Sequence, residues 1–82
     1  MITRHEVRSM MNLILARQGK PPVDDEAASL RSIGFRSLDF SELALRVERS
    51  TGRELNFDAS RLRAIASVGD VLNFFEEAAS RA

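Results

Sequence analysis

Ser37 is the residue whose setting most clearly suggests chemistry, because it stands where a long connection becomes an amphipathic segment. Asp39 falls in the first turn of that segment and Gly52 ends it, so we predict a helix from Ser37 to about Ser50. The first N–H groups of a helix lack intrahelical partners and lie at its positive end, so a phosphate ester on Ser37 would be stabilised there. A plain capping role for this serine explains the same local pattern.

The rest of the chain offers few reactive side chains. It contains no cysteine and a single histidine, His5, which excludes disulfides, thiolate nucleophiles and clusters of cysteine or histidine around a metal. The pairs Asp24-Asp25 and Glu76-Glu77 carry carboxylates for acid–base work, but neighbours in sequence point in different directions on regular structure. We therefore expect no catalytic residue and no metal site, and a protein that is not an enzyme.

The length and the net charge of the chain exclude further classes of function. The 82 residues suffice for one domain with a modest core, and we expect a single domain over residues 1–82. Twelve basic and twelve acidic side chains give a formal net charge of zero, which argues against a nucleic-acid partner. No apolar run approaches the roughly 20 residues that span a bilayer, and the start lacks a signal-peptide layout. We expect a monomer in the cytoplasm with no membrane span.

The first element expected to position Ser37 is an N-terminal helix. Thr3 and Glu6 have the spacing of a capping box, and Gly19 with the following proline pair ends the segment. Its apolar side consists of Val7, Met10, Met11 and Ile14, flanked by Leu13 and Leu15. Residues 20–36 then form a long connection, and such loops in small domains are usually functional or disordered. Within this connection Leu30 and Ile33 can pin a short turn onto the core.

The helix at 37–50 has two apolar sides. One side is assigned to the core and consists of Phe40, Leu43, Ala44 and Val47. Leu38 and Leu45 lie on the opposite side, among charged residues. Two leucines on a solvent-exposed face predict a contact surface, although isolated apolar residues on a protein surface are common enough to explain the pattern equally well.

The last third of the chain is predicted to hold a short helix and a long one. Residues 53–66 allow a short helix after Asp58, which adds Leu62 and Ile65 to the core. Ser67 and Asp70 repeat the capping-box spacing and open the last helix. Its apolar stripe consists of Val68, Val71, Leu72, Phe75, Ala78 and Ala79. No segment alternates with a period of two, so the fold class is all-α, a small bundle of three main helices plus one short helix.

The segment around Ser37 resembles a known family. The pattern Ile33-Gly34-Phe35-x-Ser37-Leu38-x-x-x-Glu42-Leu43, followed by Thr51-Gly52, is similar to the modification site and second helix of acyl carrier proteins, and is closest to polyketide-type carrier domains. The order and spacing of the helices agree over most of the chain.

The resemblance implies an acyl-carrier-protein-like fold and a stand-alone carrier. It implies that Ser37 carries a covalent 4′-phosphopantetheine arm, taken from coenzyme A, whose thiol holds acyl, aminoacyl or polyketide intermediates as thioesters. The missing cysteine is compatible with this role, because a prosthetic group supplies the sulfur. The implied partners are a phosphopantetheinyl transferase and the enzymes that load and process the acyl group.

Partners of such carriers read the second helix around the modified serine. By resemblance, the docking residues are Arg36, Leu38, Asp39, Glu42, Leu45 and Glu48. The residues that would shelter the acyl group are Phe35, Val47, Leu62, Ile65 and Leu72. Arg36 stands where the family most often has Asp, and Arg46 and Arg49 alternate with the glutamates as charge pairs or as a recognition pattern. These departures favour a specialised pathway over general fatty-acid synthesis.

Two other hypotheses remain open. The same fold can serve as an unmodified adaptor or regulatory protein that binds partners through the second helix, with Ser37 acting only as a cap. A small catalytic domain is the least favoured, since nothing in the pattern supplies a polar cleft around the carboxylate pairs.

Overall fold

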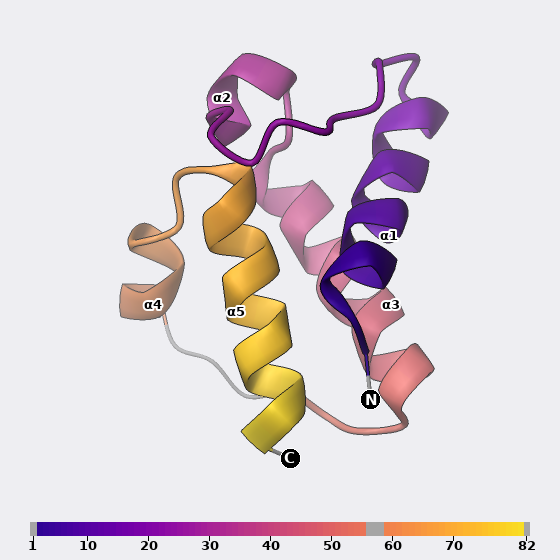
Figure 1. The fold of residues 1–82 in the computed structure, drawn as a ribbon, viewed down its shortest axis with the longest axis vertical. Helices are drawn as coiled ribbons and strands as arrows, with labels where there is room; N and C mark the ends of the chain where they lie inside the picture. The colour runs from indigo at the N-terminus through magenta and orange to yellow at the C-terminus, as the bar shows by residue number, and fades with distance from the viewer. Residues whose placement is uncertain (1, 56–58, 82) are drawn as a thin grey trace.

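The computed structural model describes residues 2–55 and 59–81, which fold into an all-helical bundle. Its helices are α1 (Arg4–Arg17), α2 (Leu30–Ile33), α3 (Ser37–Thr51), α4 (Ala59–Arg63) and α5 (Val68–Arg81). Figure 1 shows the long helices α1, α3 and α5 side by side, with α2 across the upper end and α4 beside α5. Both chain ends lie at the lower end, opposite the start of α3. The predicted fold class is confirmed, with α2 as a second short helix where only a turn was expected.

Local capping explains where the long helices begin and end. The Thr3 hydroxyl accepts the Glu6 N–H and the Glu6 carboxylate accepts the Thr3 N–H, both at 3.1 Å, so the predicted capping box of α1 is confirmed. The Ser67 hydroxyl accepts the Asp70 N–H at 3.1 Å, and the Asp70 carboxylate accepts the Ser67 N–H at 3.0 Å. Gly52, with a left-handed φ of 72°, ends α3 as expected.

The core lies between α1, α3 and α5. It consists of buried side chains from these helices and the loops between them: Ile2, Val7, Met11, Ile14, Leu15, Val23, Phe35, Phe40, Leu43, Ala44, Val47, Leu55, Val68, Val71, Leu72, Phe74 and Phe75. The rings of Phe40, Phe74 and Phe75 lie 5.0–5.7 Å apart, which fixes the start of α3 against α5. The predicted stripe of α5 is confirmed at Val68, Val71, Leu72 and Phe75, while the side chain of Ala79 lies outside the described part.

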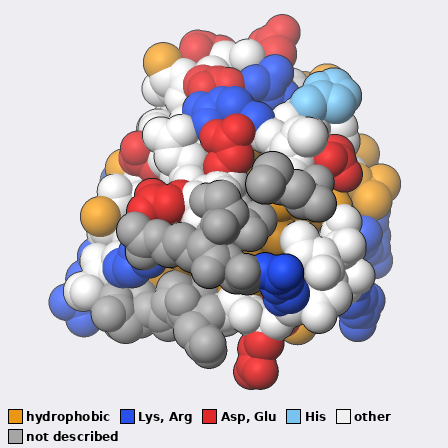
Figure 2. All heavy atoms as spheres, turned by 60° about the horizontal axis from the view of Figure 1, so that its bottom comes forward, with side chains coloured by type: hydrophobic (Ala, Val, Ile, Leu, Met, Phe, Trp, Pro, Cys, Tyr) orange, Lys and Arg blue, Asp and Glu red, His pale blue; other side chains and the backbone are white. Residues whose placement is uncertain are grey.

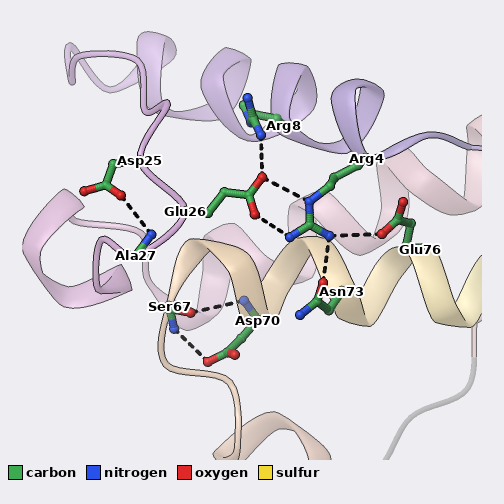
Figure 3. A network of polar contacts seen from close by, with 9 residues as sticks. All are labelled: Arg4, Arg8, Asp25, Glu26, Ala27, Ser67, Asp70, Asn73 and Glu76. Carbon is green, nitrogen blue, oxygen red and sulfur yellow. Dashed lines mark hydrogen bonds and ion pairs between the residues drawn. The ribbon is translucent and has the colours of Figure 1, made fainter.

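A polar network holds the connection between α1 and α2 against the bundle. Figure 3 shows Glu26 of this connection accepting hydrogen bonds from two arginines of α1. Arg4 donates its Nε to Glu26 Oε2 at 3.0 Å, and Arg8 donates Nη2 to the same oxygen at 2.6 Å. Arg4 also reaches α5, where its Nη1 contacts Asn73 Oδ1 at 2.7 Å and Glu76 Oε1 at 3.0 Å. The Arg4 guanidinium, followed by that of Arg8, lowers the pKa of Glu26.

Backbone hydrogen bonds join the same connection to the start of α5. An isolated antiparallel bridge pairs Ser29 with Ser67. The Leu30 N–H donates to the Ala66 carbonyl and the Val68 N–H donates to the Ala28 carbonyl, both at 2.9 Å. These bonds attach the connection to the start of α5 immediately before α2.

The surface carries charges of both signs. On the face drawn in Figure 2, Asp and Glu side chains are interspersed with Lys and Arg side chains, so neither sign dominates that face. Across residues 2–55 and 59–81, no helix is long and apolar enough to cross a membrane.

Candidate functional site

Ser37 is the first residue of α3, and its side chain is exposed. The N-cap position belongs to Arg36, whose backbone is extended (φ −102°, ψ 176°) and whose side chain has no acceptor atom. Asp39 supplies only the reciprocal half of a capping box, because its Oδ2 accepts the N–H of the N-cap residue Arg36 at 2.8 Å. Within the described residues, the Ser37 hydroxyl makes no hydrogen bond. The interpretation of Ser37 as a cap is therefore wrong, and its hydroxyl is available to a reagent in solvent.

The Asp39 carboxylate is a structural group. Its side chain is only 8% exposed, and its second oxygen, Oδ1, accepts a hydrogen bond from Gln18 Nε2 at 2.5 Å. Gln18 is the C-cap residue of α1, so this contact joins the end of α1 to the start of α3. Asp39 was predicted to dock partners; its burial and these two hydrogen bonds give its carboxylate a role in the fold, and the docking role stays a prediction.

Lys20 holds the other side of the turn that leads to Ser37. Its ammonium donates to the Gly34 carbonyl and to Gln18 Oε1, both at 2.6 Å. Gly34 needs its left-handed φ of 73° to end α2, and a Cβ there would lie 2.8 Å from the Lys20 ammonium nitrogen. We call Gln18, Lys20 and Asp39 the clamp, since together they fix the backbone on both sides of Phe35.

A cavity of about 660 Å³ opens beside Ser37. It is lined by Leu30, Arg31, Gly34, Phe35, Arg36, Ser37, Phe40, Ser41, Leu62 and Ile65. Phe35 and Phe40 are buried core residues, whereas Leu62 and Ile65 contribute partly buried side chains from α4 and the segment after it. The wall is thus apolar inside and carries hydroxyl and guanidinium groups, with no carboxylate among its described residues.

The residues predicted to shelter an acyl group divide into two sets. Phe35, Leu62 and Ile65 line the cavity beside Ser37. Val47 and Leu72 are fully buried in the core and do not line it. Leu30, Arg31 and Ser41 complete the wall and were missed, because α2 has too few residues to show a helical period and Ser41 lies on a polar side of its helix.

The remaining predicted docking residues lie along α3. Leu38 is 84% exposed and Leu45 is 53% exposed, as expected for a contact surface, and the Arg36 side chain is exposed as well. Glu42 pairs with Arg46 of the same helix and with Arg17 of α1, both at 3.1 Å. Glu48 Oε2 accepts the Leu55 N–H at 2.8 Å. These two glutamates therefore have bonds within the fold, and Glu42 and Arg46 form one of the intrahelical pairs considered from the sequence.

The carboxylate pairs offered for acid–base work lie elsewhere. Asp24 and Asp25 are exposed on the connection between α1 and α2, where Asp25 Oδ1 accepts the Ala27 N–H at 3.0 Å. Glu76 binds Arg4 on the surface of α5. None of these carboxylates lines the cavity beside Ser37.

One of three comparisons with known proteins found a similar fold. No protein-family model and no curated protein sequence matches the chain. A solved structure, the acyl carrier protein from Thermotoga maritima, superposes with a TM-score of 0.71 at 20% sequence identity. The match covers 95% of this chain and 92% of that one. The chain therefore has the fold of an acyl carrier protein.

Proposed function

We propose that the protein is a carrier of acyl-type groups and that Ser37 is the attachment site of its 4′-phosphopantetheine arm. One observation carries the proposal. In a chain with this fold, an exposed serine hydroxyl that makes no hydrogen bond with the described residues stands at the start of α3, on the wall of a largely apolar cavity. A serine that capped this helix would stand at the N-cap position, whereas here Arg36 is the N-cap and Ser37 is the first helical residue.

The residues around Ser37 fit such an arm. The phosphodiester would lie at the N-terminus of a 15-residue helix, where backbone N–H groups and the helix dipole favour a negative charge. Arg31 and Arg36 line the same cavity and add positive charge near that position. The cavity volume of about 660 Å³ falls within the range of about 300–1,000 Å³ typical of sites for small organic groups.

Attachment makes one new bond. Ser37 Oγ would attack the pantetheine-bearing phosphorus of coenzyme A and the bridging P–O bond of its pyrophosphate would break. This forms a phosphodiester and releases adenosine 3′,5′-bisphosphate, while the serine proton passes to a base of the transferase. When attached, the arm supplies a thiol that holds acyl groups as thioesters. The protein's own part is to hold the attachment point rigid and to offer apolar walls from Phe35, Leu62 and Ile65.

The proposed protein is a carrier and not a catalyst. Its enzymes would be a phosphopantetheinyl transferase and the proteins that load and process the bound group. The replacement of an acidic residue by Arg36 beside Ser37 supports a specialised pathway over general fatty-acid synthesis.

Intact-mass measurement tests the attachment site. The wild-type protein is incubated with coenzyme A and each of several phosphopantetheinyl transferases, and we expect the mass of one phosphopantetheine to be added. Ser37→Ala should gain none. Ser41→Ala is the matched control, because Ser41 is also an exposed serine of α3 on the wall of the same cavity, and it should be modified like the wild type.

The opposite results are equally informative. A chain that stays unmodified with every transferase, and that is also bare when purified from its native source, would refute the proposal and favour the unmodified adaptor. Modification of Ser37→Ala would move the site to another residue.

A further inference from the structure

We propose that the partners which dock at the Ser37 end of α3 present an acidic surface, with an apolar pocket for Leu38 bordered by carboxylates that pair with Arg31 and Arg36. The inference rests on the proposed function, because a carrier must bring its attachment serine to other proteins. It adds a statement about the charge and polarity of the partner surfaces that bind this end of α3.

Leu38 is the apolar centre of this surface. It follows the attachment serine directly, and 84% of its side chain is exposed, more than for Leu13 or Leu45, the other large apolar side chains exposed on the described chain. The next residue, Asp39, is buried, so Leu38 stands out from a fixed backbone. A leucine held in water at this position is suited to fill a pocket on a partner.

Two cations line the cavity beside Ser37 and have no ion pair among the described residues. Arg31 and Arg36 are exposed, and neither makes an ion pair or side-chain hydrogen bond with any residue the structure describes. Lys20 adds a third positive charge at Gly34, where both of its hydrogen-bond acceptors are uncharged oxygens. Arg31 and Arg36 thus line the cavity beside Ser37, and Lys20 is bound at the turn that leads to it.

The carboxylates of α3 do not cancel this charge at the surface. Asp39, the one closest in sequence to Ser37, is buried and occupied by the Arg36 N–H and Gln18. Glu42 lies between Arg17 and Arg46, so it is matched by two cations. One phosphodiester on Ser37 would add a single negative charge. The three cations Lys20, Arg31 and Arg36 would then still exceed the two negative charges of that phosphodiester and the buried Asp39.

The positive character belongs to this end of the helix. At the other end a shallow hollow is lined by Leu45, Arg49 and Arg53 together with Glu48 and Glu54, so both signs are present there. A protein that docks at Ser37 therefore contacts the exposed Leu38 and the cations Arg31 and Arg36 at the same end of the helix. Electrostatic complementarity requires carboxylates on the surface of that partner. A second copy docking by the same surface would place arginine against arginine, which disfavours a symmetric dimer.

The test compares two transferases as probes, one with an acidic carrier-binding surface and one with a basic one. The double variant Arg31→Glu/Arg36→Glu reverses the charge beside Ser37. The control Arg49→Glu/Arg53→Glu makes the same change in net charge at the far end of α3, about 20 Å away at 1.5 Å per residue. The rate of mass gain gives kcat/KM for each pair, at low and at high salt, and circular dichroism verifies that each variant is folded.

We expect opposite responses from the two probes. With the acidic transferase, reversal at Arg31 and Arg36 should lower kcat/KM by about tenfold, and added salt should slow the wild type. With the basic transferase, the same reversal should raise kcat/KM by a similar factor. The control should change either value by less than about twofold, since charges that far apart are largely screened.

Other outcomes overturn the inference. Equal effects of the two double variants would show that only net charge matters. A loss of rate with both transferases would show that Arg31 and Arg36 act in some other way than by charge complementarity, although mass gain at Ser37 would still support the proposed function. Binding of the wild type to phosphatidylserine vesicles, lost on reversal, would assign the positive end to a membrane. If no variant gains mass with any transferase, the proposed function fails first and the inference fails with it.

Discussion

Asp39 should be among the most sensitive polar positions of the chain, although it lies on a helix that faces solvent on one side. Its carboxylate accepts the Arg36 N–H at 2.8 Å and Gln18 Nε2 at 2.5 Å, and it lies in the first turn of α3. Asp39→Ala removes both acceptors at once. The Arg36 N–H then has no partner in the fold, and α1 loses its polar contact with the start of α3.

The size of the effect follows from these contacts. A hydrogen bond to a charged group contributes about 1.5–3 kcal/mol, and an acidic residue in the first helical turn adds about 0.3–1 kcal/mol. Solvent reaches the exposed Arg36 and replaces part of the loss, so we expect Asp39→Ala to lower the free energy of unfolding by about 2–4 kcal/mol. Asp39→Asn keeps one carbonyl acceptor and should lose about half as much. A chain of 82 residues has a total stability of about 4–12 kcal/mol, so the alanine variant should be marginal.

Denaturant unfolding followed by far-ultraviolet circular dichroism measures this loss, since the chain has neither tryptophan nor tyrosine for a fluorescence assay. A loss of about 3 kcal/mol also corresponds to a fall in Tm of about 12–24 °C for a domain of this size. Asp24→Ala is the control, because Asp24 is exposed and makes no hydrogen bond or ion pair within the described chain. It should stay within about 0.5 kcal/mol of the wild type. An Asp39→Ala variant as stable as this control would refute the structural role of Asp39.

Three further substitutions test other parts of the fold. The pKa of Glu26 is lowered from its ordinary 4.5, so its ion pairs stabilise the fold above that pH and are lost as pH falls through the lower folded value. In unfolding measured against pH, the stability difference between wild type and Glu26→Gln should be constant from neutral pH down to about 5 and shrink below 4.5. Gly34→Ala forces alanine into a φ of 73° and against the Lys20 ammonium, so it should lower the free energy of unfolding by about 1–2 kcal/mol. Gly19→Ala has the same backbone strain at φ 74° but open space around the new Cβ, so it lacks the steric contact. Phe75→Ala empties a fully buried ring position and should cost about 3–5 kcal/mol by the same denaturant titration; a loss below 1 kcal/mol would contradict the packing described for Phe40 and Phe74.

Sequence reasoning succeeded where the determinants are local. The capping boxes at Thr3 and Ser67 and the left-handed glycine at Gly52 depend on residues within four positions of one another, so spacing alone predicts them. The core stripe of α5 follows from helical periodicity in the same way. These local signals determine the three long helices and hence most of the bundle.

The details around Ser37 depend on contacts between distant parts of the chain. Asp39 resembled an exposed docking residue because its burial depends on Gln18, which lies 21 positions earlier. Lys20 reaches Gly34 across 14 positions, and no periodic pattern predicts such a contact. Ser37 was proposed from its place at a loop-to-helix junction and from resemblance, but only the structure shows that Arg36 is the N-cap and that the Ser37 hydroxyl makes no hydrogen bond with the described residues.

The clamp limits how far the proposed attachment segment can be transplanted. A peptide copied from residues 33–43 would contain Ser37, Leu38 and Asp39, but it would lack Gln18 and Lys20, which hold the backbone on either side of Phe35. If this peptide were fused to another protein, it would have to order its own turn before binding a modifying enzyme. The entropy lost in that ordering would weaken the binding. A graft that keeps the native geometry must also carry the end of α1, so the smallest portable unit of this site is a helix pair.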